Sequence, residues 1–299
     1  MAGGRAVDVI VCGDANADLL FDRVPQVELD KEKLAAGMDL MLGGSSSITA
    51  VNLSAEGLKV AIVGVVGDDL FGRFVEKRLR AGGVITSHLR RRIQGRTGVT
   101  VWMRRNGRRA GVTFPGVLED LVPADVSAGL LARARHMHVG AYFLLTGLHN
   151  GLPALFSAAR RAGVTTSLDT NWDPSERWDS GIREVLNETD VFLPNEDEAK
   201  RLTGETAVRG AARELARLAR VVAVKRGARG ALVRCGAEVV EFPAPRVRVV
   251  ETTGAGDAFN AGFLARFVRG ETLAECARAG VESGARAVTR AGGGAAIRG

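Results

Sequence analysis

A glycine-rich turn with one carboxylate lies near the C-terminus, in the stretch VVETTGAGDAFNAGF. Gly254 and Gly256 would let backbone N–H groups approach an anion without interference from Cβ atoms. The apolar pattern that follows predicts a helix from about Ala255, whose first N–H groups also favour an anion. Asp257 would then suit a base that deprotonates an attacking hydroxyl while the N–H groups stabilise a phosphoryl group. Taken alone, the turn fits an ordinary helix with an acidic first turn equally well.

Two other kinds of phosphate loop are excluded by the sequence. The chain contains no Gly-Lys dipeptide, so it has no Walker A loop. Position 259 is not glycine, so the dinucleotide-binding pattern of three glycines is incomplete after Gly254 and Gly256. That pattern also belongs to an early βαβ unit, whereas this turn lies near the C-terminus.

Further polar residues follow predicted strands. Asp18, in GDANADLLF, is a carboxylate able to accept two hydroxyl hydrogen bonds, as a sugar diol requires. Asn195 and Glu198 stand at i and i+3 at the start of a predicted helix, which also fits a variant of the capping box. His136 and His138 share a strand face, but a metal site would need a third ligand that the neighbouring sequence does not supply.

Apolar strand patterns alternate with helical patterns along the chain, which indicates a parallel sheet covered on both faces. We therefore predict an α/β fold with a doubly wound, mainly parallel sheet. Ligands of such sheets bind beyond the carboxyl ends of the strands, where these polar residues fall. The predicted strands span 7–12, 60–66, 135–139, 165–169, 191–194 and 221–225, and the predicted helices span 45–57, 70–80, 153–162 and 213–218.

Two segments, 19–42 and 98–114, interrupt the alternation with mixed patterns and turn signals. Asn106 and Gly107 stand between two β-favouring runs, which is a strong hairpin signal. We expect both segments to form a small β-sheet that stands off the main one. Because no long linker or internal repeat appears, residues 1–299 are predicted to form a single domain.

Composition narrows the class of protein. The chain is 46% hydrophobic with a net charge of +7, and its three cysteines are scattered, which favours buried thiols in the cytosol. No apolar tract is long enough to span a bilayer, and no signal peptide is apparent. Arginine clusters at 90–92 and 104–109 lack the aromatic residues and motifs of nucleic-acid binding, so we expect no nucleic-acid partner.

Four blocks of sequence together resemble the signatures of the ribokinase-like (PfkB) carbohydrate kinases. ETTGAGDAFNAGF is similar to the family's C-terminal signature, and the segment from Gly43 to Gly72 resembles its N-terminal one. SLDTNWDP and FLPNEDEAKRLTG are similar to its two middle motifs. The blocks occur in the family's order and cover nearly all of the chain.

The resemblance implies ATP-dependent phosphorylation of a hydroxyl group, with Mg²⁺ as cofactor. Asp257 matches the catalytic base, in a turn of Gly254, Ala255 and Gly256 that supplies the anion hole. The small β-sheet would be the family's lid, through which a homodimer could form. By the same resemblance, Asp18, Gly43 and Gly44 would contact the sugar. Asn171, Lys225 and Gly227 would contact the nucleotide. Asn195 and Glu198 would lie near Mg²⁺, which Glu198 would bind through a water.

The sequence departs from the family pattern at two places. Ile48 stands where the motif carries an asparagine that contacts a sugar hydroxyl, so we do not expect an ordinary ribose pose. Asn52, one helical turn further on, could supply a substitute hydrogen bond. Glu251 replaces the aspartate that opens the C-terminal signature. In some members this region, with Thr253 and the TRAGGG segment, holds a monovalent cation, so K⁺ activation is uncertain.

Three functions therefore stay open. The first, which we predict, is an ATP-dependent carbohydrate kinase of the cytosol, and the other two are alternatives to it. A nucleoside kinase is the second, because the same architecture serves both and Tyr142, at a strand end, would be placed to stack on a base, although packing is the commoner role there. The third is a sugar-binding protein without catalytic activity, which the intact glycine turn with Asp257 argues against.

Overall fold

The computed structural model describes residues 6–290. Its centre is a nine-stranded sheet in the order β13-β12-β11-β10-β9-β8-β1-β4-β5. Pairing is parallel from β11 to β5 and antiparallel at β12 and β13. The strands are β1 (Val7–Cys12), β4 (Val60–Gly67), β5 (Ile85–Arg92), β8 (Ala134–Val139), β9 (Thr165–Leu168), β10 (Val191–Phe192), β11 (Val221–Lys225), β12 (Ala231–Cys235) and β13 (Glu238–Phe242).

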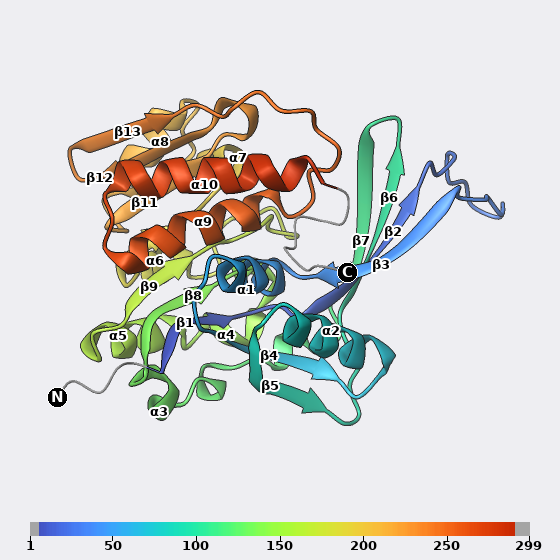
Figure 1. Cartoon of the computed structure of the whole chain (residues 1–299), viewed down its shortest axis with the longest axis horizontal. Helices are drawn as coiled ribbons and strands as arrows, with labels where there is room; N and C mark the ends of the chain where they lie inside the picture. The colour runs from blue at the N-terminus through green and yellow to red at the C-terminus, as the bar shows by residue number, and fades with distance from the viewer. Residues whose placement is uncertain (1–5, 291–299) are drawn as a thin grey trace.

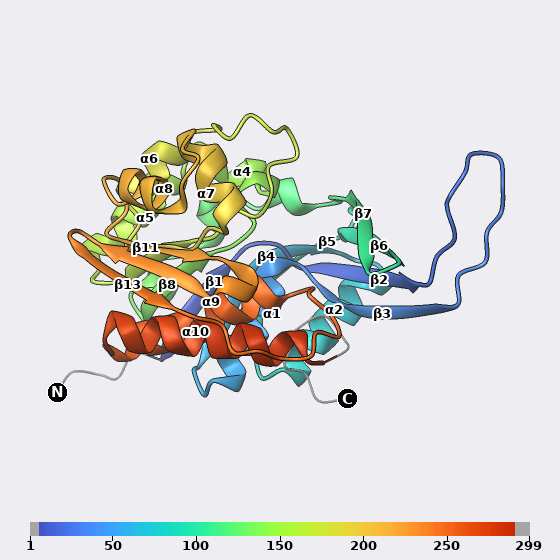
Figure 2. The ribbon, with the colours of Figure 1, turned by 90° about the horizontal axis from the view of Figure 1, so that it is seen from above.

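Helices cover both faces of this sheet, as expected for a doubly wound fold (Figures 1 and 2). One face carries α1 (Ser45–Ala55), α2 (Leu70–Ala81), α9 (Ala255–Arg269) and α10 (Leu273–Val288). The other carries α3 (Ala128–Leu131), α4 (Thr146–His149), α5 (Leu152–Arg161), α6 (Ile182–Asn187), α7 (Glu196–Thr203) and α8 (Val208–Leu215). Four short 3₁₀ helices are η1 (Leu118–Asp120), η2 (Pro123–Asp125), η3 (Tyr142–Leu144) and η4 (Gly227–Arg229).

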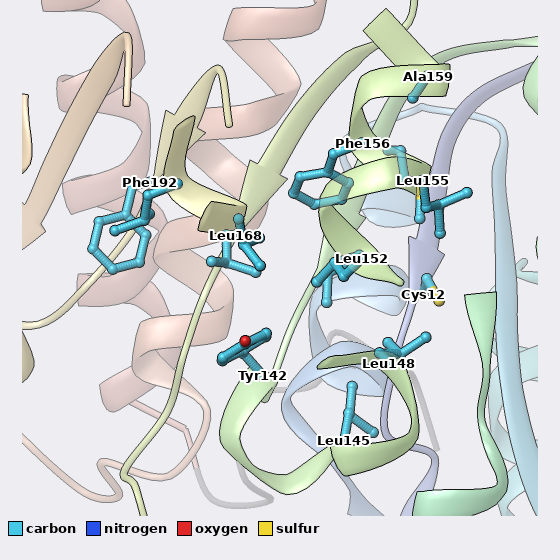
Figure 3. Packing of buried hydrophobic residues seen from close by; sticks show 14 of the residues in the cluster. Cys12, Tyr142, Leu145, Leu148, Leu152, Leu155, Phe156, Ala159, Leu168 and Phe192 are labelled. Atoms are coloured by element: carbon cyan, nitrogen blue, oxygen red, sulfur yellow. The ribbon is translucent and has the colours of Figure 1, made fainter. Parts of the chain in front are cut away.

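The apolar core is divided by the sheet into two clusters. Along β1, Ile10 and Cys12 face the cluster beneath α5, whereas Val9 and Val11 face the cluster beneath α1 and α9. Alternate side chains of a strand point to opposite faces, so a strand buried on both sides must be apolar throughout. Figure 3 shows the first cluster, in which Leu152 and Phe156 of α5 lie against the sheet.

A separate four-stranded sheet, which we call the lid, projects from one end of the main sheet (Figure 1). Its order is β3-β2-β6-β7, and β2 and β6 run parallel. Both residues of the tight turn between β6 and β7 have positive φ, +49° at Asn106 and +72° at Gly107, as a two-residue hairpin prefers. The lid predicted from 19–42 and 98–114 is confirmed. Its strands are β2 (Asn16–Asp22), β3 (Gly37–Gly43), β6 (Val99–Arg105) and β7 (Arg108–Phe114).

The boundaries of one helix were predicted wrongly. The helix expected at 213–218 is α8, which spans Val208–Leu215 and ends before Leu218. Gly210, Ala211 and Ala212 are small and buried on the side that packs against the sheet, and the predicted range of 213–218 left them out. Among the described residues, no helix has the length and apolar character to cross a membrane.

Candidate active site

The N-termini of two helices meet beyond the carboxyl ends of the strands. Gly254 has φ +73°, a left-handed conformation that glycine adopts readily, and ends the turn that leads into α9. Ala255 N donates to Thr252 O over 3.3 Å. The N–H groups of Gly256 and Asp257 follow in the first helical turn, where no preceding turn of helix offers an acceptor. The predicted glycine turn and helix start are therefore present, although the Ala255 N–H points back into the turn.

The second helix, α1, presents Ser45 to Asp257. Ser45 Oγ donates to Asp257 Oδ1 over 2.5 Å. The buried carboxylate of Asp14 accepts hydrogen bonds from Ser45 N over 3.0 Å and from Ser46 N over 2.8 Å, which satisfies the first turn of α1. Gly44 has φ +84°, and a Cβ there would lie 2.7 Å from Asp14 O, so the entry into α1 requires glycine. Asp14 and Ser45 were not singled out from the sequence.

Burial raises the pKa of Asp257 to about 7. The hydrogen bond from Ser45 lowers it, whereas the nearby carboxylate of Asp169 raises it further and the Lys225 ammonium opposes that increase. A carboxylate whose pKa lies near neutral pH is well matched to take a proton from a hydroxyl and to release it afterwards.

Lys225 belongs to a buried polar network beside the glycine turn. Its Nζ donates to Asp169 Oδ2 over 2.7 Å and to Asn260 Oδ1 over 3.3 Å, and Asn260 Nδ2 also donates to Asp169 Oδ2. A Cβ added at Gly256 would lie 3.6 Å from Lys225 Nζ, so the ammonium is next to the turn. Although burial lowers the Lys225 pKa, the carboxylates of Asp169 and Glu198 hold it above its ordinary value. Asp169 and Asn260 were not singled out from the sequence, although both lie inside the quoted motifs.

Asn195 and Glu198 form the capping box of α7. Glu198 Oε2 accepts from Asn195 N over 2.7 Å, Oε1 accepts from Asn195 Nδ2 over 2.6 Å, and Glu198 N donates to Asn195 Oδ1 over 2.9 Å. Burial and the charge of Asp169 raise the pKa of Glu198 to about 7. The capping alternative left open by the sequence is therefore confirmed.

The same pair fits a magnesium ion held through water. Each oxygen of Glu198 accepts one hydrogen bond and keeps acceptor capacity for another partner. Mg²⁺ usually keeps several waters and binds through one or two carboxylates together with substrate phosphates. The described residues contain no group of three or more acidic, histidine or cysteine side chains suited to a metal, so a cage built from protein alone is not present among them.

Two further residues expected at the nucleotide lie at this edge of the sheet. Asn171 follows β9 with φ +53°, and its N–H donates to Asp169 Oδ1 over 3.5 Å. Gly227 follows β11 with φ +56°, and a Cβ there would meet no atom within 4 Å. Gly227 thus faces open space, as a position approached by a ligand requires.

Asp18 lies at the base of the lid. Its Oδ2 accepts from Trp102 Nε1 over 3.0 Å, and a Cβ at Gly43 would lie 2.0 Å from its Oδ1. Burial raises the pKa of Asp18 to about 6, while the hydrogen bond from Trp102 lowers it. Gly43 therefore allows β3 to pass against this carboxylate.

Ile48 is buried in the second turn of α1, with 3% of its surface exposed. Asn52, the residue that the sequence suggested as a substitute hydrogen-bonding group, donates from Nδ2 to the Ile48 carbonyl over 2.9 Å. This donor group is therefore directed at its own helix.

Tyr142 packs in the core, as the commoner role of a strand-end aromatic residue predicts. Its side chain is fully buried among the residues of Figure 3, its hydroxyl donates to Ser180 O over 2.6 Å, and its ring stacks on His149 at 4.4 Å. A base cannot reach this ring in the present arrangement, so the expectation that Tyr142 contacts the substrate has no support here.

The two strand histidines are also buried in the protein interior. His136 shares hydrogen bonds with Thr165 and Ser167, and His138 shares one with Ser167. Burial lowers the pKa of His136 to about 3 and of His138 to about 4, so both are neutral near pH 7.

Glu251 and Thr253, the residues expected near a monovalent cation, contact arginines of the lid. Arg104 Nη1 lies 2.6 Å from Glu251 Oε2, and Arg109 Nη1 donates to Thr253 Oγ1. Thr253 Oγ1 in turn donates to Glu251 Oε1 over 2.9 Å. Most of the TRAGGG segment lies outside the described residues.

The sequence matches the model of the family described as pfkB family carbohydrate kinase over residues 7–298. An uncharacterized sugar kinase of Archaeoglobus fulgidus is 31% identical over 245 residues, which cover 81% of this chain and 96% of that protein.

Solved structures are similar over nearly the whole chain. Arabidopsis thaliana ribokinase, complexed with ribose and ATP, has a TM-score of 0.84 at 24% identity and covers 97% of this chain and 95% of its own. A putative ribokinase II of E. coli, in complex with ATP and Mg²⁺, has a TM-score of 0.85 at 23% identity and covers 98% and 96%. Both likenesses show the same fold, a large mainly parallel sheet with a small lid sheet.

Proposed function

This chain belongs to the pfkB family of carbohydrate kinases, phosphotransferases with an alcohol group as acceptor, and we propose that Asp257 is its general base. The observation that supports this role best is the position of Asp257. It lies at the N-terminus of α9, receives a hydrogen bond from Ser45, and stands beside the N–H groups that would hold a phosphoryl group. Its pKa of about 7 suits proton transfer at neutral pH.

In the proposed reaction the acceptor oxygen forms a bond to the γ-phosphorus of ATP while the bond to the β–γ bridging oxygen breaks. The acceptor's proton moves to Asp257, and ADP leaves. The N–H groups of Gly256 and Asp257 stabilise the phosphoryl oxygens, with Gly254 and Ala255 shaping the turn. The Lys225 ammonium lies next to Gly256 and adds positive charge on the nucleotide side, where Asn171 and Gly227 would also contact ATP.

A magnesium ion would be held near Asn195 and Glu198 through water. When bound, it would neutralise charge on the ATP phosphates. Glu198 keeps both oxygens oriented by Asn195, so its acceptor sites are pre-arranged before the ion arrives.

The acceptor is proposed to bind between Asp18 and Asp257, with Gly43 and Gly44 allowing the backbone to approach it. Ile48 offers an apolar side chain where the family motif offers an amide, so we expect weak activity on ribose and better activity on an acceptor with an apolar or deoxygenated edge. A nucleoside acceptor remains the alternative within the family. The buried Tyr142 gives it no stacking surface.

The lid would also carry a homodimer contact. The face opposite Asp18 and Trp102 presents apolar side chains to solvent, which a second copy of the chain could cover. The most exposed of them are Met38 (57%), Leu40 (37%), Val112 (66%) and Phe114 (53%). The molar mass in solution of the full chain and of Val112→Asp would test this contact.

A cytosolic location is a further proposal. Cys12, Cys235 and Cys276 are free thiols, and cysteines of secreted proteins are more often paired. Fractionation of expressing cells would test it.

The experiment that tests the kinase assignment is an ADP-release screen over hexoses, pentoses, acid sugars, inositols and nucleosides. Wild type and Asp257→Asn should be compared with ATP and Mg²⁺ present. ADP release that depends on one class of acceptor and is lost in the variant supports the proposal. Acceptor binding without ADP release would instead identify a sugar-binding protein without activity.

A further inference from the structure

Two arginines of the lid contact the turn that leads into the proposed anion hole. Arg104 of β6 lies 2.6 Å from Glu251, whose side chain is 3% exposed. The same guanidinium contacts Asp22 Oδ1 from Nε over 3.2 Å and from Nη2 over 3.1 Å. Arg109 of β7 donates to Thr253, two residues after Glu251.

A buried carboxylate needs a positive partner, because removing an unpaired charge from water is costly. The guanidinium of Arg104 supplies that charge to Glu251 and donates directly to one of its oxygens, while Thr253 donates to the other. A monovalent ion on the same carboxylate would lie close to the guanidinium and be repelled by it. As they are arranged here, Glu251 and Thr253 therefore do not fit a bound K⁺.

We propose that the Arg104 guanidinium takes the place of a monovalent cation at the Glu251 carboxylate. Arg104 would thereby act as a positioning residue for the anion hole. Glu251 is also tied to the end of α10, since its N–H donates to Val288 O over 3.2 Å. The short turn from Glu251 to Gly254 is thus held between α10 and the lid. Because Arg104 belongs to a lid strand, the turn is held in this way only while the lid keeps its contact with Glu251.

The second arginine links the same turn to the acceptor side. The Arg109 guanidinium lies 4.5 Å from the centre of the Trp102 ring, and Trp102 donates to Asp18. One face of the lid therefore carries the proposed acceptor carboxylate of Asp18 and, through Arg104 and Arg109, contacts the turn before the anion hole. Ordering of the lid by an acceptor would order that turn as well. This inference depends on the proposed function only for its effect on turnover.

The test compares the full-length wild type with Arg104→Gln and Arg104→Lys, and Arg105→Gln is the matched control. Arg105 is the next residue of β6 but is exposed, with a 3.5 Å contact to Gln26. Melting temperatures are measured with KCl and with tetramethylammonium chloride at equal ionic strength. This readout requires no substrate, so it does not depend on whether the kinase assignment is correct.

Wild type and Arg105→Gln should melt at the same temperature in both salts. Arg104→Gln should melt about 4 °C or more lower in tetramethylammonium, because Glu251 is left without its counter-charge. Added K⁺ should restore part of the lost melting temperature of Arg104→Gln, and this effect should saturate as the K⁺ concentration rises. Arg104→Lys should need no K⁺ for its stability, because its ammonium still supplies a positive charge to Glu251. A saturable K⁺ stabilisation of wild type would overturn the proposal, as would a folded Arg104→Gln that K⁺ does not restore.

Amide hydrogen exchange of the same proteins tests the positioning role. Peptides that contain residues 251–257 should exchange faster in Arg104→Gln than in Arg105→Gln, and K⁺ should slow them again. Equal exchange in the two variants would overturn the role. If Arg104→Gln does not fold, the double variant Arg104→Gln/Glu251→Gln removes both charges and should fold and be indifferent to K⁺. If the double variant also fails to fold, this result would count against the proposed pairing of Arg104 with Glu251.

Discussion

The hydroxyl of Ser45 donates to Oδ1 of Asp257 over 2.5 Å, although 212 positions of sequence separate the two residues. This bond joins the first turns of α1 and α9 and directs the carboxylate into the space between them. It also lowers the pKa of Asp257 against the effect of burial, which raises it. Ser45 therefore contributes to both the orientation and the proton affinity of the proposed base, beside burial and the neighbouring charges.

Asp257→Asn should lower kcat by about 10²–10⁴, because the amide keeps the shape of the side chain but cannot take the acceptor's proton. ATP affinity and melting temperature should change little. Steady-state kinetics beside a thermal melt measure both quantities. The control is Asp197→Asn, which removes an exposed carboxylate from the first turn of α7. Wild-type turnover of Asp257→Asn would show that Asp257 is only a helix-terminal residue.

Ser45→Ala should shift the acidic limb of the pH–rate profile to higher pH. The base works as a carboxylate, so kcat/KM falls as pH drops through its pKa of about 7. The hydrogen bond from Ser45 lowers this pKa, so its loss raises the pKa and moves the fall in kcat/KM to higher pH. Activity at pH values well above the new pKa should be largely retained. Ser47→Ala is the control, since Ser47 Oγ donates to Asp14 O rather than to Asp257. A shift to lower pH, or none, would contradict this account.

Lys225→Met should be strongly destabilising, because it leaves Asp169 buried without its cation. Breaking a buried ion pair from one side typically costs about 3–5 kcal/mol. The double variant Lys225→Met/Asp169→Asn should regain much of this loss. Denaturant unfolding of the wild type, Lys225→Met, Asp169→Asn and the double variant gives the interaction energy. Additive effects of the two changes would show that the 2.7 Å contact contributes nothing to stability.

Ile48→Asn should raise kcat/KM for ribose relative to the best acceptor of the wild-type enzyme. The change restores an amide where the family motif has one, and a site that hydrogen-bonds a hydroxyl favours the substrate that carries it. Ile48→Val is the control, because it shortens the side chain without adding a polar group. If ribose is already the best wild-type acceptor, the inference from Ile48 is wrong.

The fold class and most of the helices and strands could be predicted from the sequence. Apolar strands alternating with helical patterns predicted the parallel sheet, and Asn106 with Gly107 predicted the hairpin of the lid, because both depend on neighbouring residues. The glycine turn with Asp257 was also readable, since positive φ at Gly254 and the start of α9 are local properties. The boundaries of α8 were predicted wrongly because the range 213–218 left out the small buried residues with which its packed side begins.

The contacts between these side chains could not be predicted from the sequence, because they depend on how distant elements pack together. Ser45 with Asp257, Lys225 with Asp169, and Arg104 with Glu251 are each far apart in the sequence. Local periodicity predicts the face on which a residue lies but not its partner on another element. Burial, the charges of Asp169 and Lys225 and the hydrogen bond from Ser45 then set the pKa of Asp257, and the lid brings Arg104 against Glu251. These properties arise only when the helix termini, the strand ends and the lid are brought together.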